Sequence, residues 1–170
     1  RVVLTVARVR TLPPSASQGR RPLLVVDRDL PKLPLFARIQ EVLPGVPVFC
    51  EVTSDPEIST VDNLASLLRA GGHDVVVAVG GGSAMDCAKA AACLAAGSQS
   101  SIRPAHSEGA PLGSARLPLI AVPTTAGTGS EVTPFAVLSD PGKQIKGPLA
   151  GTALYPVHAV VDPELTYSLP

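Results

Sequence analysis

The chain has few aromatic residues and no excess of charge of either sign. Of its 170 residues none is tryptophan, two are tyrosine and three are phenylalanine. Lysine and arginine number 14 together, as do aspartate and glutamate, so the formal net charge is zero. Without a basic excess, no surface that binds nucleic acid through its phosphates is expected. A core poor in aromatics must be filled by valine, leucine and alanine, which is typical of sheets buried on both faces.

Long apolar runs and paired cysteines are also missing. No apolar run reaches the roughly 18 residues that a membrane-spanning helix needs, so no membrane partner is expected. The three cysteines, Cys50, Cys87 and Cys93, are odd in number and stand in apolar surroundings. We therefore expect reduced packing residues in a cytoplasmic protein. None has the spacing of a metal-ligand set, and no metal site is expected in this chain.

Short apolar runs alternate with segments of helical periodicity along one domain, residues 1–170. Strands are expected over 23–27, 46–52, 74–80, 117–123, 133–138 and 157–161. Helices are expected over 31–42, over 58–70 and from the glycines after residue 80 to residue 96. This alternation predicts βαβ units and an α/β fold, with a parallel sheet flanked by helices. The segment 97–116 is rich in Ser, Gly, Pro and Ala without periodicity, and a mobile surface loop is expected there.

The stretch Gly80-Gly-Gly-Ser83 stands between a β-branched run and an alanine-rich segment. It predicts a strand, a tight turn and a helix N-terminus. Glycines there let a phosphate approach the backbone, and the free N–H groups and positive end of a helix favour an anion. Ser83 is expected to cap the helix through its hydroxyl. A plain βα turn that binds nothing remains the alternative.

A second loop of small residues follows the strand expected over 117–123. Thr124-Thr-Ala-Gly-Thr-Gly-Ser-Glu131 carries four hydroxyl side chains and two glycines. Hydroxyls can donate to phosphate or ribose oxygens, and glycines let the backbone come close. Two such loops at the carboxyl ends of parallel strands fit a ligand crevice at the point where the strand order reverses.

Three blocks together resemble the iron-containing (group III) alcohol dehydrogenases. They are Gly80-Gly-Gly-Ser-Ala-Met-Asp-Cys-Ala-Lys89, Pro123-Thr-Thr-Ala-Gly-Thr-Gly-Ser-Glu131 and Val161-Asp-Pro-Glu-Leu-Thr-Tyr-Ser-Leu-Pro170. The resemblance covers about residues 23–170, whereas residues 1–20 match poorly. It implies a Rossmann-like domain that binds NAD(P), followed by a helical domain that holds Fe or Zn. The family's metal ligands fall beyond Pro170, so we expect a cofactor-binding half that is inactive alone.

The resemblance also implies which residues contact the cofactor. They are Asp27, Gly81, Gly82, Ser83, Asp86, Thr124, Thr125, Thr128, Thr133, Phe135 and Lys146. Independently, a carboxylate at a strand end pairs with ribose hydroxyls and repels a 2′-phosphate, so Asp27 favours NAD over NADP. A turn acid at Asp27, a core residue at Phe135 and a solvated lysine at Lys146 remain the alternatives. No residue here is expected to be catalytic.

Two further features bear on the site. Lys89 is interpreted as a structural helix residue rather than a ligand. Asp55-Pro56 stands where the family commonly has Asn-Pro, and its added negative charge is expected to alter substrate choice or weaken cofactor binding.

The resemblance implies an NAD- and metal-dependent dehydrogenase of small-molecule alcohols or aldehydes, and leaves a homo-oligomer open. The alternatives are a non-catalytic nucleotide-binding module, a polyol- or sugar-phosphate dehydrogenase, and an enzyme like dehydroquinate synthase. The block from Thr124 to Glu131 favours the alcohol dehydrogenases over the synthases.

Overall fold

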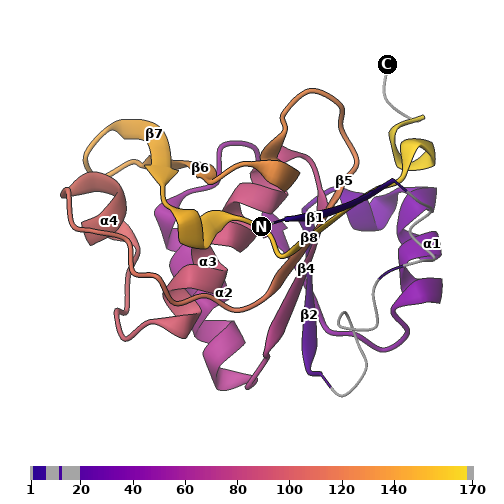
Figure 1. The fold of residues 1–170 in the computed structure, drawn as a ribbon, viewed down its shortest axis with the longest axis horizontal. Helices are drawn as coiled ribbons and strands as arrows, with labels where there is room; N and C mark the ends of the chain where they lie inside the picture. The colour runs from indigo at the N-terminus through magenta and orange to yellow at the C-terminus, as the bar shows by residue number, and fades with distance from the viewer. Residues whose placement is uncertain (1, 7–11, 13–19, 168–170) are drawn as a thin grey trace.

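The computed structural model describes residues 2–6, 12 and 20–167, and its centre is a six-stranded parallel sheet (Figure 1). Across the sheet the order is β1-β8-β5-β4-β2-β3, and every neighbouring pair is parallel. The strands are β1 Val3–Val6, β2 Pro22–Asp27, β3 Val48–Val52, β4 Val75–Gly80, β5 Leu119–Pro123 and β8 His158–Val161. The predicted α/β class and parallel sheet are confirmed.

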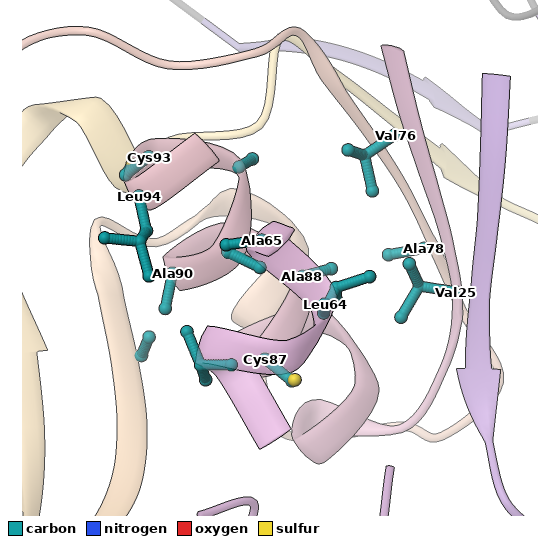
Figure 2. Packing of buried hydrophobic residues seen from close by; sticks show 14 of the residues in the cluster. Val25, Leu64, Ala65, Val76, Ala78, Cys87, Ala88, Ala90, Cys93 and Leu94 are labelled. Atoms are coloured by element: carbon teal, nitrogen blue, oxygen red, sulfur yellow. The ribbon is translucent and has the colours of Figure 1, made fainter. Parts of the chain in front are cut away.

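Helices cover both faces of this sheet. Helices α2 (Ile58–Ala70) and α3 (Gly82–Ala96) lie on one face, and α1 (Pro34–Val42) lies on the other. Alternate strand residues feed the two cores, so Val76 packs under α2 and α3 whereas Val77 faces α1. Figure 2 shows the first of these cores, where small side chains of α3 meet those of α2. The run of alanines in α3 lets the helices and sheet approach closely, which explains how a core can form with so few aromatics.

The chain reverses its direction of travel across the sheet after β3. Strand β3 pairs with one side of β2, and β4 then pairs with the other side. The helices that follow β2 and β4 therefore leave on opposite faces, and a crevice opens between the carboxyl ends of these two strands. Asp27 ends β2 and Gly80 ends β4, so both lie at this point.

A separate two-stranded sheet stands beside α3. It is an antiparallel hairpin of β6 (Phe135–Asp140) and β7 (Ile145–Ala150). Only its first strand was expected, over 133–138. The second strand has one buried residue, Leu149, and contains Gly147 and Pro148, so it shows neither alternation nor strand composition. Strand β7 could therefore not be recognised from its own residues.

The segment 97–116 contains a short helix, α4 (Arg103–Ser107). The expectation of an irregular segment is thus wrong at α4, although its mobility stays a prediction. Ile102 is buried, and its amide donates to Asp62 Oδ1 on α2 at 2.8 Å. The Arg103 guanidinium lies 3.2 Å from the buried Asp140 carboxylate at the end of β6. These long-range contacts define the helix, and local composition does not reveal them.

Strand β1 was not expected from the sequence. It pairs with β8 at one edge of the sheet, and Val3, Leu4 and Val6 are all more than half exposed. An edge strand exposed on both sides shows no burial pattern to read. Most of the poorly matching segment 1–20, and residues 168–170 of the third block, lie outside the described residues.

The cysteines follow the prediction only in part. Cys87 and Cys93 are buried as expected, and burial raises the pKa of both thiols, that of Cys93 to about 11. Cys50 is exposed, because it lies on β3 at the other edge of the sheet, so its assignment as a packing residue is wrong. In the part of the chain that the structure describes, no helix has the length and apolar character to cross a membrane.

Candidate functional site

Two adjoining hollows open at the carboxyl ends of the parallel strands. The Asp27 hollow, of about 450 Å³, is lined by residues that include Asp27, Gly81 and Thr125. The Phe135 hollow, of about 340 Å³, is lined by residues that include Asp86 and Phe135. Gly82, Ser83 and Thr128 line both. The structure therefore brings together every predicted site residue except Lys146, and we call the combined depression the cleft.

The glycine turn, residues Gly80 to Ser83, packs closely against neighbouring side chains that leave no room for a Cβ at its first position. Gly80 has φ +154°, and a Cβ there would overlap Asp27 Oδ2 and lie 2.8 Å from the Ala84 Cβ. A Cβ on Gly82 would lie 3.3 Å from Thr128 Cγ2, and one on Gly81 would face the Thr125 methyl at 3.4 Å. The first glycine thus makes room for the acid, and the other two make room for the threonine loop.

The N-terminus of α3 faces the cleft. The N-cap residue is Gly81, and no side chain caps the helix there. Ser83 lies inside the first turn, so the prediction that its hydroxyl caps α3 is wrong. The cause is the glycine run, which lets the helix begin earlier than a serine cap would allow. Amides of an uncapped first turn, with the positive end of the helix dipole, make an anion site.

Asp27 is joined to the glycine turn by its side chain. Its Oδ2 accepts a hydrogen bond from the Gly81 amide at 3.0 Å. Partial burial raises the pKa of this carboxyl, whereas hydrogen bonds from the Gly81 amide and from its own amide act in the opposite direction. The nearby negative charge of Asp29 raises the pKa further, and Asp29 lines the same hollow. Two acids, rather than one, therefore face this end of the cleft.

The threonine loop, residues Thr124 to Glu131, follows β5 and packs against the glycine turn. The Thr124 amide donates to Gly80 O at 2.9 Å, which ties the ends of β5 and β4 together. Thr128 Oγ1 accepts from the Ser130 amide at 3.3 Å. Thr125 Oγ1 is buried and has no hydrogen-bond partner among the described residues. A buried hydroxyl without a partner needs an explanation, and an anion held on the uncapped α3 would supply one. The residues at this end therefore fit the diphosphate of a dinucleotide.

Asp86 braces the wall of the Phe135 hollow. Its Oδ1 accepts from Ser130 Oγ at 2.6 Å, and its Oδ2 accepts from the Val137 amide at 2.8 Å. The same carboxylate lies 3.0 Å from Lys89 Nζ. Phe135 is 48% exposed and faces the cleft, so the alternative of a core residue is wrong. Lys89 is buried within these contacts, in agreement with its interpretation as a structural residue.

Lys146 stands on β7 at the rim. Its Nζ lies 2.7 Å from Asp55 Oδ1, and both side chains are more than half exposed. Asp55 has φ +54°, in the left-handed region. The Ser139 amide donates to Pro56 O at 3.0 Å, so the turn after β3 is hydrogen-bonded to the hairpin. Lys146 therefore reaches the Phe135 hollow through Asp55 rather than by lining it.

Sequence reasoning missed several lining residues. Ser130 and Val137 line the Phe135 hollow, and Leu33 and Ser54 line the Asp27 hollow. Ser130 stands within the second block and could have been chosen for its hydroxyl. The others carry no local signal, because only the pairing of strands brings them to the cleft.

The histidines are engaged elsewhere. His158 Nε2 lies 2.8 Å from Thr5 Oγ1, and His106 Nε2 lies 3.2 Å from Gly147 O. His73 Nδ1 lies 3.2 Å from Arg21 O. Within the described residues, no group of three or more His, Cys, Asp or Glu side chains could hold a metal ion.

Comparison with known proteins identifies the family. The model of the family described as iron-containing alcohol dehydrogenase matches residues 1–163. This chain belongs to the iron-containing alcohol dehydrogenase family. The match takes in residues 1–20, which the three sequence blocks leave uncovered.

Curated relatives within the family are longer than this chain. The 1-propanol dehydrogenase PduQ of Salmonella typhimurium is 41% identical over 150 residues, which are 86% of this chain and 37% of that protein. The 4-hydroxybutyrate dehydrogenase of Cupriavidus necator is 43% identical over 159 residues, 89% of this chain and 40% of that one. The chain thus spans about two fifths of the length of these iron-containing alcohol dehydrogenases.

Solved structures show the same fold. The sulfoacetaldehyde reductase from Bifidobacterium kashiwanohense, in complex with NAD+, superposes with a TM-score of 0.89 at 35% identity, over 99% of this chain and 46% of that chain. The NADH-dependent butanol dehydrogenase A of Thermotoga maritima gives a TM-score of 0.85 at 26% identity, over 99% and 45%. Residues of this chain therefore form the architecture found in part of each of these longer proteins.

Proposed function

We propose that this chain is the cofactor-binding part of an NAD- and metal-dependent alcohol dehydrogenase that acts on small alcohols or aldehydes. The observation that carries the proposal is the junction of Asp27, the glycine turn and the threonine loop at one switch point of the sheet. In this proposal the metal ligands and the groups that close over the substrate are supplied outside the described residues. The protein is proposed to work in the cytoplasm, in keeping with its unpaired cysteines.

The Asp27 hollow takes the adenosine ribose and the diphosphate in this proposal. The Asp27 carboxylate accepts hydrogen bonds from the ribose hydroxyls while Gly81 N–H holds one of its oxygens in place. The amides at Gly82 and Ser83 and the hydroxyl of Thr125 face the diphosphate. Negative charge from Asp27 and Asp29 disfavours the 2′-phosphate of NADP.

The Phe135 hollow takes the nicotinamide end. Thr133 and Phe135 line it, and Thr128 stands between the two hollows. Bound NAD supplies the hydride acceptor, and this chain orients the ring and shields one of its sides from water. Asp86 contributes by bracing the wall, because its carboxylate is already engaged by Ser130 and Val137.

Titration calorimetry with NADH, NADPH and ADP tests this function. We expect the chain to bind NADH, and to bind NADPH at least about tenfold more weakly, since a carboxylate close to a phosphate is repulsive. Thr125→Val keeps the shape of the side chain and removes the unpartnered hydroxyl, and it should weaken NADH binding several-fold. Thr152→Val, on an exposed residue outside both hollows, is the matched control. Absence of NADH binding by the folded chain would overturn the proposal.

A further inference from the structure

Lys89 is among the largest fully buried side chains of the described chain and is 1% exposed. It lies on α3, and its ammonium group has three oxygen partners. Nζ lies 3.0 Å from Asp86 Oδ1, donates to Ser130 O at 3.0 Å, and also donates to Phe135 O. Burial lowers the pKa of Lys89, and the Asp86 charge opposes that change. Three donors thus meet three acceptors, so the buried cation is fully satisfied.

Two of the three oxygen partners of Lys89, the backbone oxygens of Ser130 and Phe135, belong to one wall of the cleft. Ser130 begins the 3-10 helix η4 (Ser130–Val132), and Phe135 begins β6. Asp86 adds bonds to Ser130 Oγ and to the Val137 amide. Both ends of the segment 130–137 are therefore held by two side chains one turn apart on α3. Ser130, Phe135 and Val137 all line the Phe135 hollow.

The first turn of the same helix, at Gly82 and Ser83, forms another part of the lining of that hollow. One helix therefore supplies one wall directly and holds the other wall through Lys89 and Asp86. An apolar side chain at position 89 would fill the space but leave Ser130 O and Phe135 O without their donor. Burying the charge of a lysine costs free energy unless acceptors surround it. Lys89 therefore requires that Ser130 O and Phe135 O stay close to Asp86.

We propose that Lys89 is a positioning residue that sets the separation of the two walls of the Phe135 hollow, and so the fit of the nicotinamide end of a dinucleotide. The inference rests on the proposed function for the identity of the ligand. Lys89 touches no ligand in this proposal, because its ammonium group is enclosed by the wall that it holds. Its effect reaches the cleft through the backbone at Ser130 and Phe135.

The chain offers a comparison variant whose contacts lie at the other end of α3. Arg69, on α2, donates to Leu94 O, to Gly97 O at 3.1 Å and to Gln99 O at 2.7 Å. Like Lys89, Arg69 is a cation that donates to several backbone carbonyls, but these carbonyls lie at the C-terminal end of α3 and just beyond it. Arg69→Met removes such a contact away from the cleft, and Lys89→Met removes one beside it. If Lys89 acted only on stability, both variants would lower the free energy of unfolding, and neither would change the NADH affinity of the folded chain.

The test compares these two variants with the wild-type chain in three measurements: urea unfolding, calorimetric titration with NADH, and amide hydrogen exchange. We expect both variants to unfold at lower urea concentration. Only Lys89→Met should lose NADH affinity, by about tenfold or more, since a site must be held within about 0.5 Å to keep its fit. Exchange should accelerate over 130–137 in Lys89→Met and over 94–99 in Arg69→Met.

Unchanged NADH affinity in folded Lys89→Met, or an equal loss in Arg69→Met, would overturn the positioning role. If Lys89→Met does not fold, Asp86→Asn serves as the milder variant, because it keeps the lysine but removes the negative charge and one of the two acceptor oxygens that face Lys89, Ser130 and the Val137 amide. In Asp86→Asn we expect faster hydrogen exchange at the Val137 amide and a several-fold loss of NADH affinity. If neither quantity changes, the positioning role is rejected. Should the wild-type chain bind no NADH, the proposed function fails, while the exchange measurements still decide whether Lys89 holds this wall.

Discussion

Lys146 and Asp55 form an ion pair, with Nζ and Oδ1 2.7 Å apart, across the rim of the Phe135 hollow. The pair joins β7 to the turn after β3, where Asp55 has a left-handed backbone conformation. Aspartate tolerates that conformation better than most residues, because its short side chain can bond locally. The negative charge anticipated at this position is thus offset by a lysine that would otherwise be available to an anionic ligand.

Asp55→Asn should therefore strengthen NADH binding, by about threefold at low salt, because the freed ammonium group attracts the cofactor phosphates. Lys146→Met should weaken binding under the same conditions. Calorimetric titrations at low and at high salt check both changes, and salt should reduce the difference between the variants. The free energy of unfolding should change by less than about 1 kcal/mol, as is usual for exposed ion pairs. Weaker binding in Asp55→Asn would show that the carboxylate itself serves the ligand.

Gly82→Val should weaken NADH binding by about tenfold or more, because the added side chain meets Thr128 and intrudes on the place of the diphosphate. The control is Gly113→Val, since a Cβ at Gly113 has no atom within 4 Å and this residue lies outside the cleft. Calorimetry measures the affinity, and circular dichroism verifies the fold. Full affinity in a folded Gly82→Val would mean that the cofactor does not pass over this turn.

Asp27→Gly should raise the affinity for NADPH relative to NADH, because a carboxylate that repels the 2′-phosphate is removed. The absolute affinity for NADH should fall as well, since the Gly81 amide loses its acceptor. Asp29→Asn separates the contributions of the two acids that line this hollow. A wild-type preference for NADPH would refute the assignment of Asp27 to the ribose.

Asp27 also predicts a dependence of stability on pH. Its pKa is raised in the folded chain, so between the ordinary aspartate value and the raised value the folded state binds more protons than the unfolded state. The free energy of unfolding should then fall as pH rises through that window, and the loss should persist above it. Asp27→Asn should remove this component. Urea unfolding of both proteins across the window, compared as a difference, isolates it from the other carboxyl groups.

Thiol reactivity should separate the three cysteines. Iodoacetamide should modify Cys50 in the folded chain and leave Cys87 and Cys93 unmodified, because both are buried with raised pKa values. Peptide mass spectrometry before and after addition of urea measures this directly. Rapid labelling of Cys93 without denaturant would indicate that the segment packed over it opens readily.

Much of the cleft could be predicted because its parts are local in sequence. Each of β2, β4 and β5 is a short apolar run that ends at or next to residues that line the cleft, and parallel strands bring such ends to one edge. The glycine turn and the threonine loop are therefore expected at one crevice from their positions, and the family resemblance adds Asp27 to them. The outer boundary of the site is harder to predict, because Leu33 and Ser54 come to line the cleft only once the strand order is known.

Residues whose role depends on distant partners could not be predicted. Strand β7 contains a glycine and a proline and becomes a strand only by pairing with β6. The helix at Arg103 is defined by the buried Asp140, far along the chain. The prediction that Ser83 caps α3 is wrong for a local reason. Consecutive glycines allow the helix to begin either before or after Ser83, and it begins at Gly82. Where the backbone is least restricted, sequence says least about where an element starts.

The two halves of the cleft differ in how they are built. The Asp27 end is formed by strands of the main sheet, whereas the Phe135 end is carried by a hairpin that forms a separate two-stranded sheet. Substitutions in the hairpin can therefore reshape one end without shifting the strands that form the other. Under the proposed function, the contacts to the nicotinamide end could thus change while those to the ribose and diphosphate stay in place.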